Sequence, residues 1–257
     1  MPKICLDAGH CGKQNWNPKT SPTYWESLMA WELHLALRQE LLQYDGIEVV
    51  VTRDAEEKDL ELTARGRKAI GCDLFLSLHS NAVANPTYND PTDRAVVIYP
   101  VSGKERNLAD ALSVCITETM GLHDKPQLYQ RWNSSHNADY YGVIRGAASV
   151  GVPGLILEHS FHTNKRAAEW LLNSGNLRTL AAAEAKVIAA RYKCKLKNEA
   201  TDEPLPGLHE DAFKKPFRVK VGAYNNPTNA INCYNELHEK GFDQAYIEDA
   251  NGKVVMF

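Results

Sequence analysis

Four residues of this chain have the side-chain types needed for metal-assisted hydrolysis, namely His10, Glu26, His79 and Glu158. Two imidazoles and a carboxylate can bind a zinc ion and leave one coordination position open, while a second carboxylate can take up the proton of a metal-bound water. Each of the four ends an apolar, strand-like run or opens a helix-like segment. The residue types and their positions therefore predict a zinc hydrolase with one metal ion.

The two histidines occur in comparable settings. His10 follows a short run of small residues after an apolar segment, and such a turn directs an imidazole out of the end of a strand. His79 ends the apolar run 73–78 and is followed by Ser80 and Asn81. A lone histidine in either place is more often a hydrogen-bonded loop residue, so the prediction depends on the whole set.

Two acids compete for the role of the carboxylate ligand. Glu26 lies on the same helical stripe as Met29 and Leu33, whereas Glu32 is turned about 100° away from Leu33. The pattern favours Glu26 as the ligand, although an ordinary first-turn acid would also occur there.

Glu158 closes the apolar run 154–157, and partial burial there would raise the pKa of its carboxyl toward the range of a general base. A buried salt bridge is the alternative role for this side chain. His159 would point to the opposite face of the strand, which indicates a packing or supporting role. The remaining histidines are expected to be surface or structural residues: His34, His123, His136, His162, His209 and His238.

These residues need a scaffold, and the hydrophobic pattern predicts an open, mostly parallel twisted α/β sheet flanked by helices. Short apolar runs typical of parallel strands covered on both faces occupy 3–6, 47–51, 74–78, 95–99 and 154–157. Helical patterns occupy 26–42, 60–70, 104–120 and 176–193. In such sheets ligands bind beyond the carboxyl ends of the strands, where three of the four candidate residues fall.

Composition excludes several other classes. The formal net charge is −3 and the basic residues are scattered, so no nucleic-acid partner is expected. No run approaches the roughly 18 apolar residues of a membrane span, so no membrane insertion is expected. The six cysteines form no CxxC pair, which argues against a thiolate zinc site and favours reduced thiols; Cys11, beside His10, is the one that could influence the site.

The chain is expected to divide into a catalytic domain (1–195), a linker (196–215) and a small α+β module (216–257). The segment 198–216, which covers most of the linker, is charged and contains three prolines. The module has a βαββ pattern, with a strand at 217–223, a helix at 229–240, a strand at 244–247 and a final strand at 253–257 that is reached through a hairpin at Asn251-Gly252. About 40 residues is near the lower limit for independent folding, so self-association into a homodimer or docking on the catalytic domain is expected.

Six segments together resemble the zinc-dependent N-acetylmuramoyl-L-alanine amidases of the amidase 3 type. They are LDAGH (6–10), the acid-headed helix at Glu26, TRD (52–54), LTARGRKA (62–69), DLFLSLHSNA (73–82) and VPGLILEHSFHTN (152–164). The resemblance implies that His10, Glu26 and His79 bind Zn²⁺, that Glu158 is catalytic, and that the bond between N-acetylmuramic acid and L-alanine in bacterial peptidoglycan is hydrolysed. Where relatives often have a glycine-rich stretch, this chain has CGKQNWNPKTSPTYW (11–25).

Substrate contacts are expected from the loops 82–94 and 123–141, which are rich in Asn, Tyr and Trp, and from Asn81 and Arg145. The tail, from Phe217 to Ile247, resembles the first half of a SPOR-type module. That resemblance implies a role in binding glycan strands, with self-association as the alternative.

The sequence begins directly on a strand-like run, without the pattern of an export signal. Synthesis in the cytoplasm followed by release to the cell wall is therefore expected, as holins release phage or prophage endolysins. The alternatives are an enzyme of a spore-forming mother cell, a mature form recorded without its signal, a zinc carboxypeptidase acting on peptides, and a non-catalytic peptidoglycan-binding protein.

Overall fold

The computed structural model describes residues 1–16, 20–84, 89–197, 234, 247–248 and 254–256. The chain divides into two compact units, Met1–Ala200 and Thr201–Phe257. The first unit carries all the candidate site residues.

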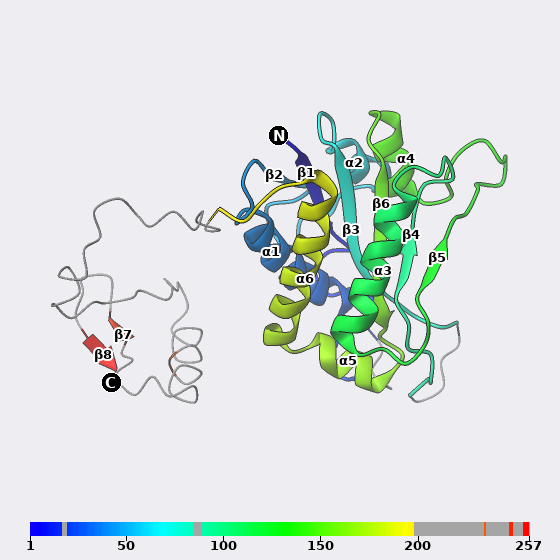
Figure 1. Ribbon diagram of the computed structural model, residues 1–257. Coiled ribbons are helices and arrows are strands. Elements are labelled where there is room, and N and C mark those ends of the chain that lie inside the picture. Colours follow the sequence, from blue (N-terminus) through cyan, green and yellow to red (C-terminus); the bar gives the residue numbers. More distant parts are fainter. Residues whose placement is uncertain (17–19, 85–88, 198–233, 235–246, 249–253, 257) are drawn as a thin grey trace, which may run out of the picture. The chain divides into compact units, whose positions relative to one another are not determined.

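A six-stranded sheet forms the centre of the first unit (Figure 1). Its strands are β1 (Lys3–Ala8), β2 (Glu48–Val51), β3 (Leu74–Asn81), β4 (Val96–Ile98), β5 (Gln127–Tyr129) and β6 (Gly154–Phe161), in the order β2-β1-β3-β6-β4-β5. β2, β1, β3 and β6 run parallel, which confirms the prediction of a mostly parallel sheet.

The strand predicted at 95–99 does not belong to the parallel set. β4 pairs antiparallel with β6 and parallel with β5, so the last two strands at this end of the sheet run against the other four. A short buried run of Val and Ile shows that a strand is covered on both faces, but it carries no information about direction. The expectation that this strand is parallel was therefore wrong.

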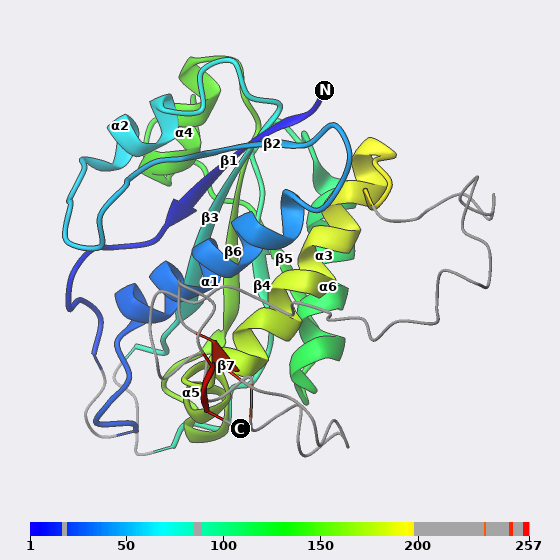
Figure 2. The same ribbon diagram turned by 90° about the vertical axis from the view of Figure 1, so that its left-hand side faces the viewer.

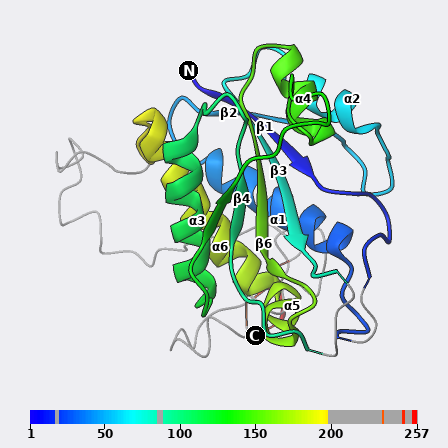
Figure 3. The same ribbon diagram turned by 90° about the vertical axis from the view of Figure 1, so that its right-hand side faces the viewer.

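Helices cover both faces of the sheet, as Figures 2 and 3 show from opposite sides. One face is covered by α1 (Glu26–Leu41), α3 (Arg106–Met120) and α6 (Ser174–Tyr192), and the other by the shorter α2 (Leu62–Arg67) and α4 (Gly142–Ser149). The helix α5 (Lys165–Leu171) precedes α6 in the chain. The apolar stripe predicted for α1 is buried, including Met29 and Leu33, and this packing fixes which side of α1 faces the sheet.

The side chains of each buried strand alternate between two separate cores. Leu155 and Leu157 join the core beneath α1, α3 and α6, whereas Ile156 joins the core beneath α4.

The hydrophobic pattern of the sequence did not predict β5, α4 or α5. It also ended two strands too early, since β3 continues to Asn81 and β6 to Phe161, so His79 and Glu158 lie within strands near their carboxyl ends.

In the second unit, β7 (Ile247–Glu248) pairs antiparallel with β8 (Val254–Met256). The predicted linker lies outside the described residues, apart from Leu196 and Lys197, as does the predicted strand 217–223. The predicted helix 229–240 is described at Tyr234 alone. Among the described residues, no helix has the length and apolarity that a bilayer span requires.

Candidate active site

His79 and Glu158 lie side by side on neighbouring strands. They are register partners in the parallel pairing of β3 with β6, so their side chains project from the same face of the sheet. Immediately beyond this pair the register shifts, and Ser160 adopts a left-handed conformation with φ of 62°. Such an irregularity bends a strand, and here it bends β6 just after Glu158.

His10 is held in place by backbone contacts from buried arginines. It follows β1 in a left-handed conformation with φ of 56°, which is uncommon for a residue with a side chain. The Nη2 of Arg65 donates to the carbonyl of His10 at 2.7 Å, and Nη1 donates to that of Ala8 at 2.9 Å. Arg53 also donates to the Ala8 carbonyl, at 3.3 Å. These bonds maintain a local conformation that a free chain would rarely adopt.

Gly9 allows the two histidines to approach one another. A Cβ at this position would lie 2.4 Å from Cε1 of His79, which is closer than carbon atoms can pack. The imidazoles of His10 and His79 meet edge to face with ring centroids 4.9 Å apart. Glycine is therefore required here because the ring of His79 lies so close to the backbone, and not because of the backbone conformation of Gly9.

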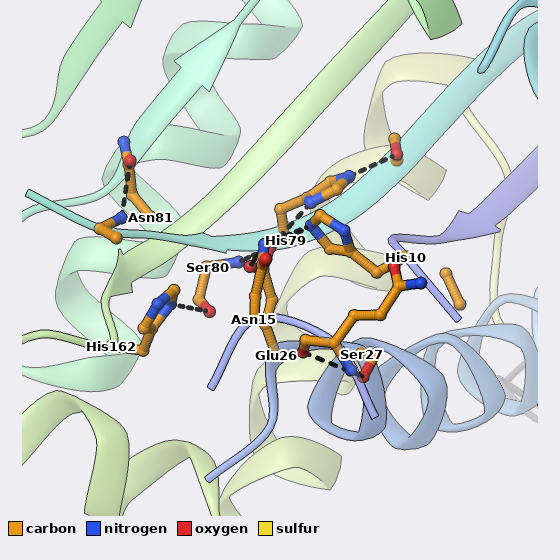
Figure 4. A network of polar contacts seen from close by, with 12 residues as sticks. His10, Asn15, Glu26, Ser27, His79, Ser80, Asn81 and His162 are labelled. Carbon is orange, nitrogen blue, oxygen red and sulfur yellow. Dashed lines mark hydrogen bonds and ion pairs between the residues drawn. The ribbon is translucent and has the colours of Figure 1, made fainter. Parts of the chain in front are cut away.

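Glu26, at the start of α1, joins the two histidines (Figure 4). Its Oε1 lies 2.8 Å from Nδ1 of His79 and 3.2 Å from Nε2 of His10. The same oxygen accepts a hydrogen bond from the backbone N–H of Ser80 at 3.1 Å. Glu32, the competing acid, is exposed and accepts a hydrogen bond from Ser174 instead.

The environment of Glu26 keeps its carboxyl ionised. Burial by itself would raise the pKa, but hydrogen bonds with His10 and His79, together with their charges, hold the pKa of Glu26 well below its ordinary value. A metal cation binds a carboxylate in its ionised form, so Glu26 is in the charge state that a metal site between two imidazoles requires.

Asn15 supports this arrangement from the loop that precedes α1. Its Nδ2 donates to Oε2 of Glu26 at 2.7 Å and lies 2.9 Å from Nε2 of His10. Its backbone carbonyl accepts from the N–H of Glu26 at 3.1 Å. Sequence reasoning assigned no role to this residue. Its position depends on how the loop 11–25 folds back, which no local pattern reports.

The residues behind His79 fix the orientation of its ring. The hydroxyl of Ser77 donates to Oδ2 of Asp7 at 2.7 Å, so its oxygen can accept from the Nε2–H of His79, 3.1 Å away. Nδ1, the nitrogen that faces Glu26, is thereby left as the one that can bind a cation. Orientation of this kind by a second residue is typical of metal-binding histidines.

The described chain contains one group of His, Cys, Asp or Glu side chains with the spacing of a metal site: His10, Glu26 and His79. Their donor atoms all lie within 4.8 Å of one another. Two imidazole nitrogens and one carboxylate oxygen form a donor set that zinc favours at catalytic sites. Donor chemistry, mutual distance and ring orientation thus all fit a zinc ion.

Glu158 has the opposite electrostatic setting to Glu26. Its Oε2 is buried and has no hydrogen-bond partner among the described residues. Burial, with a further contribution from the charge of Glu26, raises the pKa of Glu158 well above its ordinary value. A carboxyl that is costly to ionise and has an unused oxygen is suited to accepting a proton.

All four residues of the predicted site line one cavity of about 480 Å³. Its other lining residues come from the loop before α1, the ends of β3 and β6, and the elements α2 and α4: Asn15, Trp16, Leu62, Ser80, Asn81, Ala82, Tyr141, Gly142, Val143, Ile156 and His162.

The residues expected to contact substrate are distributed unevenly. Asn81 lines the cavity, as do Ala82 and Tyr141 at the ends of the two expected loops. Arg145 is not among the lining residues, and its guanidinium binds the carbonyls of Asp139 and Tyr140. The loop 11–25 contributes Trp16, which stacks on Trp25 with ring centroids 4.9 Å apart.

His159 faces away from the cavity, as expected. It is fully buried, its Nδ1 donates to the carbonyl of His79 at 2.8 Å, and its Nε2 lies 2.7 Å from Oε1 of Glu184 on α6. Cys11 is also buried, and its Sγ accepts from Nε2 of Gln14 at 3.5 Å. The described cysteines are free thiols: Cys5, Cys11, Cys72, Cys115 and Cys194.

Comparison with solved structures identifies the class of fold. The catalytic domain of CwlV, an N-acetylmuramoyl-L-alanine amidase from Bacillus (Paenibacillus) polymyxa var. colistinus, superposes with a TM-score of 0.63 at 22% identity, covering 76% of this chain and 100% of that one. An N-acetylmuramoyl-L-alanine amidase from Clostridium difficile 630 gives a TM-score of 0.63 at 19% identity, covering 75% and 97%. The sheet and its helices are thus those of an amidase catalytic domain.

Residues 4–190 match the family model of the N-acetylmuramoyl-L-alanine amidases, Amidase_3, and the chain belongs to this family. Among curated proteins it is similar to the N-acetylmuramoyl-L-alanine amidase CwlM of Bacillus licheniformis, with 26% identity over 96% of this chain and 85% of the relative. It is also similar to the sporulation-specific N-acetylmuramoyl-L-alanine amidase of Bacillus subtilis strain 168, with 24% identity over 95% and 83%.

Proposed function

We propose that this chain hydrolyses the amide between N-acetylmuramic acid and L-alanine in peptidoglycan with one Zn²⁺ ion bound by His10, Glu26 and His79. The observation that carries the proposal is the position of Glu26 Oε1, which is 2.8 Å from His79 Nδ1 and 3.2 Å from His10 Nε2. Family membership supports the bond cleaved, and the donor set supports the metal.

Zinc in this site would supply Lewis acidity, which lowers the pKa of water and polarises a carbonyl group. Glu158 would accept the proton of the attacking water and later pass it to the departing alanine nitrogen. The unpartnered Oε2 of Glu158 supports this role, because no other bond must break before it takes a proton.

Binding of the substrate would use the rim of the cavity. Trp16 is 46% exposed and offers an aromatic surface of the kind that stacks on sugar rings, while Asn81 offers a side-chain amide. The predicted contribution of Arg145 would be indirect. Its bonds to the carbonyls of Asp139 and Tyr140 hold the backbone just before Tyr141, which lines the cavity.

Mass spectrometry of the soluble products from purified peptidoglycan tests the proposal. Metal-loaded protein should release intact stem peptides that begin with a free L-alanine amine, and the chelated control should release none. Single amino acids would indicate the carboxypeptidase alternative. Binding without any product would indicate a non-catalytic wall-binding protein.

A lytic, endolysin-type role is a further proposal, and it is supported by the reaction itself, since cutting this bond weakens the wall. The similarity to a sporulation-specific amidase of Bacillus subtilis favours a competing role in a mother cell. Expression of the chain in a bacterial host with and without a co-expressed holin distinguishes them. Lysis only with the holin supports the endolysin role.

The proposed functions of the tail, glycan binding through a SPOR-like module or homodimer formation, concern residues that lie mostly outside the described chain. Sedimentation of the full chain tests self-association, and co-sedimentation of the full chain with intact peptidoglycan tests binding. A truncation ending at Lys197 is the matched control in both experiments.

A further inference from the structure

A buried acid, Asp7, lies behind the two histidines of the site and has no role in the proposed reaction. Its Oδ2 accepts from the hydroxyl of Ser77 at 2.7 Å, and its Oδ1 accepts from that of Thr52 at 2.6 Å. Nη1 of Arg65 lies 3.5 Å from the same Oδ1. All four residues are at most 3% exposed, so the cluster is shielded from water. A buried ion pair often stabilises a fold no better than apolar residues of the same size, which indicates another role for this one.

The four members of the cluster come from distant parts of the chain. Asp7 lies on β1, Thr52 directly follows β2, Arg65 lies on α2 and Ser77 lies on β3. Asp7 and Ser77 are register partners in the parallel pairing of β1 with β3, so their side chains project from the same face of the sheet. The sheet itself therefore places the carboxylate against the hydroxyl of Ser77.

One connection runs from Asp7 through Ser77 to His79. Nε2 of His79 lies 3.1 Å from Oγ of Ser77, and Nδ1 faces Glu26. A neutral imidazole that binds a cation through Nδ1 carries its proton on Nε2, and that proton needs an acceptor. A serine hydroxyl has a single proton. Because the carboxylate of Asp7 accepts this proton, the lone pairs of Ser77 are left for the Nε2–H of His79.

A second connection runs from Asp7 through Arg65 to His10. Nη1 of Arg65 also donates to the carbonyl of Ala8 at 2.9 Å, and Nη2 donates to the carbonyl of His10 at 2.7 Å. Asp59 accepts from Nη2 as well, at 3.1 Å, but its side chain is 67% exposed. The buried charge that compensates the buried guanidinium is therefore that of Asp7. With Arg65 held there, His10 is supported in its left-handed conformation.

We propose that Asp7 is a positioning residue that raises the zinc affinity of the site by orienting both histidines before an ion binds. It acts on the side chain of His79 through Ser77 and on the backbone of His10 through Arg65. Ligands that are already oriented lose less conformational freedom on binding, so the affinity is higher. The inference rests on the proposed function, because it concerns the same zinc ligands.

Two conservative substitutions provide a matched test. Ser77→Ala and Thr52→Val each remove one hydroxyl from the carboxylate of Asp7, but only Ser77 also contacts His79. Calorimetric titration of the metal-free full chain with Zn²⁺ should give an affinity 10- to 100-fold lower for Ser77→Ala, the usual effect of losing a residue that orients a metal-binding histidine. Thr52→Val should keep the affinity of the wild type. Urea denaturation of both metal-free variants should show similar losses of stability.

Asp7→Asn tests the charge itself. The amide oxygen should face Arg65 and Thr52, because the guanidinium attracts it, and the amide nitrogen should then donate to Ser77. The hydroxyl of Ser77 becomes free to donate to Nε2 of His79, which leaves the ring proton on Nδ1, where a cation should bind. Zinc affinity should therefore fall at least tenfold. In a Ser77→Ala background the same substitution should lower the affinity less, because the connection to His79 is already broken.

Each outcome of these titrations is decisive. Equal zinc affinities of the wild type and a folded Ser77→Ala variant would overturn the inference. Equal losses in Ser77→Ala and Thr52→Val would also overturn it, since the affinity would then follow the stability of the cluster and not the contact with His79. A wild-type chain that binds no zinc would overturn both the inference and the proposed metal site. Zinc binding without release of stem peptides would contradict the proposed reaction alone.

Discussion

Glu26 and Glu158 line the same cavity, and the charge of Glu26 helps to raise the pKa of Glu158. Glu26 is surrounded by donors from His10, Asn15, His79 and Ser80, which stabilise its ionised form. Glu158 has a buried oxygen without a hydrogen-bond partner among the described residues. The protein thus keeps one carboxylate ionised between the histidines and leaves the other ready to accept a proton.

Glu158→Gln should reduce turnover about 10²- to 10⁴-fold, the usual contribution of a general base. Zinc content should be unchanged, because Glu158 is not one of the proposed ligands. Kinetics with a muramoyl peptide and metal analysis of the same sample make the measurement. Undiminished activity would exclude Glu158 as the base.

The same substitution should stabilise the metal-free protein at neutral pH, because it removes a carboxylate that is costly to ionise. The pKa of Glu158 is raised on folding, so its contribution to stability is present at low pH and is lost as the pH rises above the unfolded value of about 4.3. The advantage of Glu158→Gln should therefore grow with pH and then level off above the folded pKa. Urea denaturation of both chelated proteins from pH 4 upward tests this, and a difference that does not vary with pH would contradict it.

Glu26→Gln should lower zinc affinity and abolish most of the activity, since the substitution removes one of three proposed ligands and its charge. Glu32→Gln is the matched control, because Glu32 lies on the same helix but is exposed and bonded to Ser174. Zinc binding by titration calorimetry should distinguish the two variants. Equal affinities would mean that Glu26 is not a ligand.

Gly9→Ala should displace His79, since the added carbon would lie 2.4 Å from its ring. A cost of about 1–3 kcal/mol in the free energy of unfolding is expected for overpacking, together with loss of zinc. Gly12→Ala separates backbone strain from collision, because its φ is +49° but no atom of the described residues lies within 4 Å of the added carbon. The Gly12→Ala variant should therefore have a lower free energy of unfolding but unchanged zinc binding.

His159 and Glu184 should behave as a unit. Replacing Glu184 alone by Leu should destabilise the fold by about 3–5 kcal/mol, because fully buried His159 loses its partner. Replacing both residues by Leu should cost much less than the sum of the two single changes. A double-mutant cycle measured by chemical denaturation tests the coupling, and additive effects would contradict it.

Much of this architecture can be predicted from the sequence because it depends on local patterns. The apolar runs of β1, β3 and β6 and the stripe of Met29, Leu33 and Leu37 indicate which segments are buried. The preference for Glu26 over Glu32 also follows from helical periodicity alone. Each of these features depends on residues that are close together in the chain, so it can be recognised from the sequence alone.

Other features depend on contacts between segments that are distant in the chain. The antiparallel direction of β4 is set by the path of the connections around it, and its short apolar run is compatible with either direction. Asn15 reaches His10 and Glu26 because the loop 11–25 folds back on itself, and no periodic pattern encodes that path.

His162 illustrates the same limit most directly. As a lone histidine after an apolar strand it was expected to be a surface or structural residue, yet it lines the cavity with Glu158. Its neighbours there, Tyr24 and Ser80, are far away in the chain. The sequence by itself determined the buried strands, the helices and the four polar residues at their ends. Only the tertiary structure decided which side chains of the cavity are held ionised and which share hydrogen bonds, because these properties depend on which distant side chains come together in a buried site.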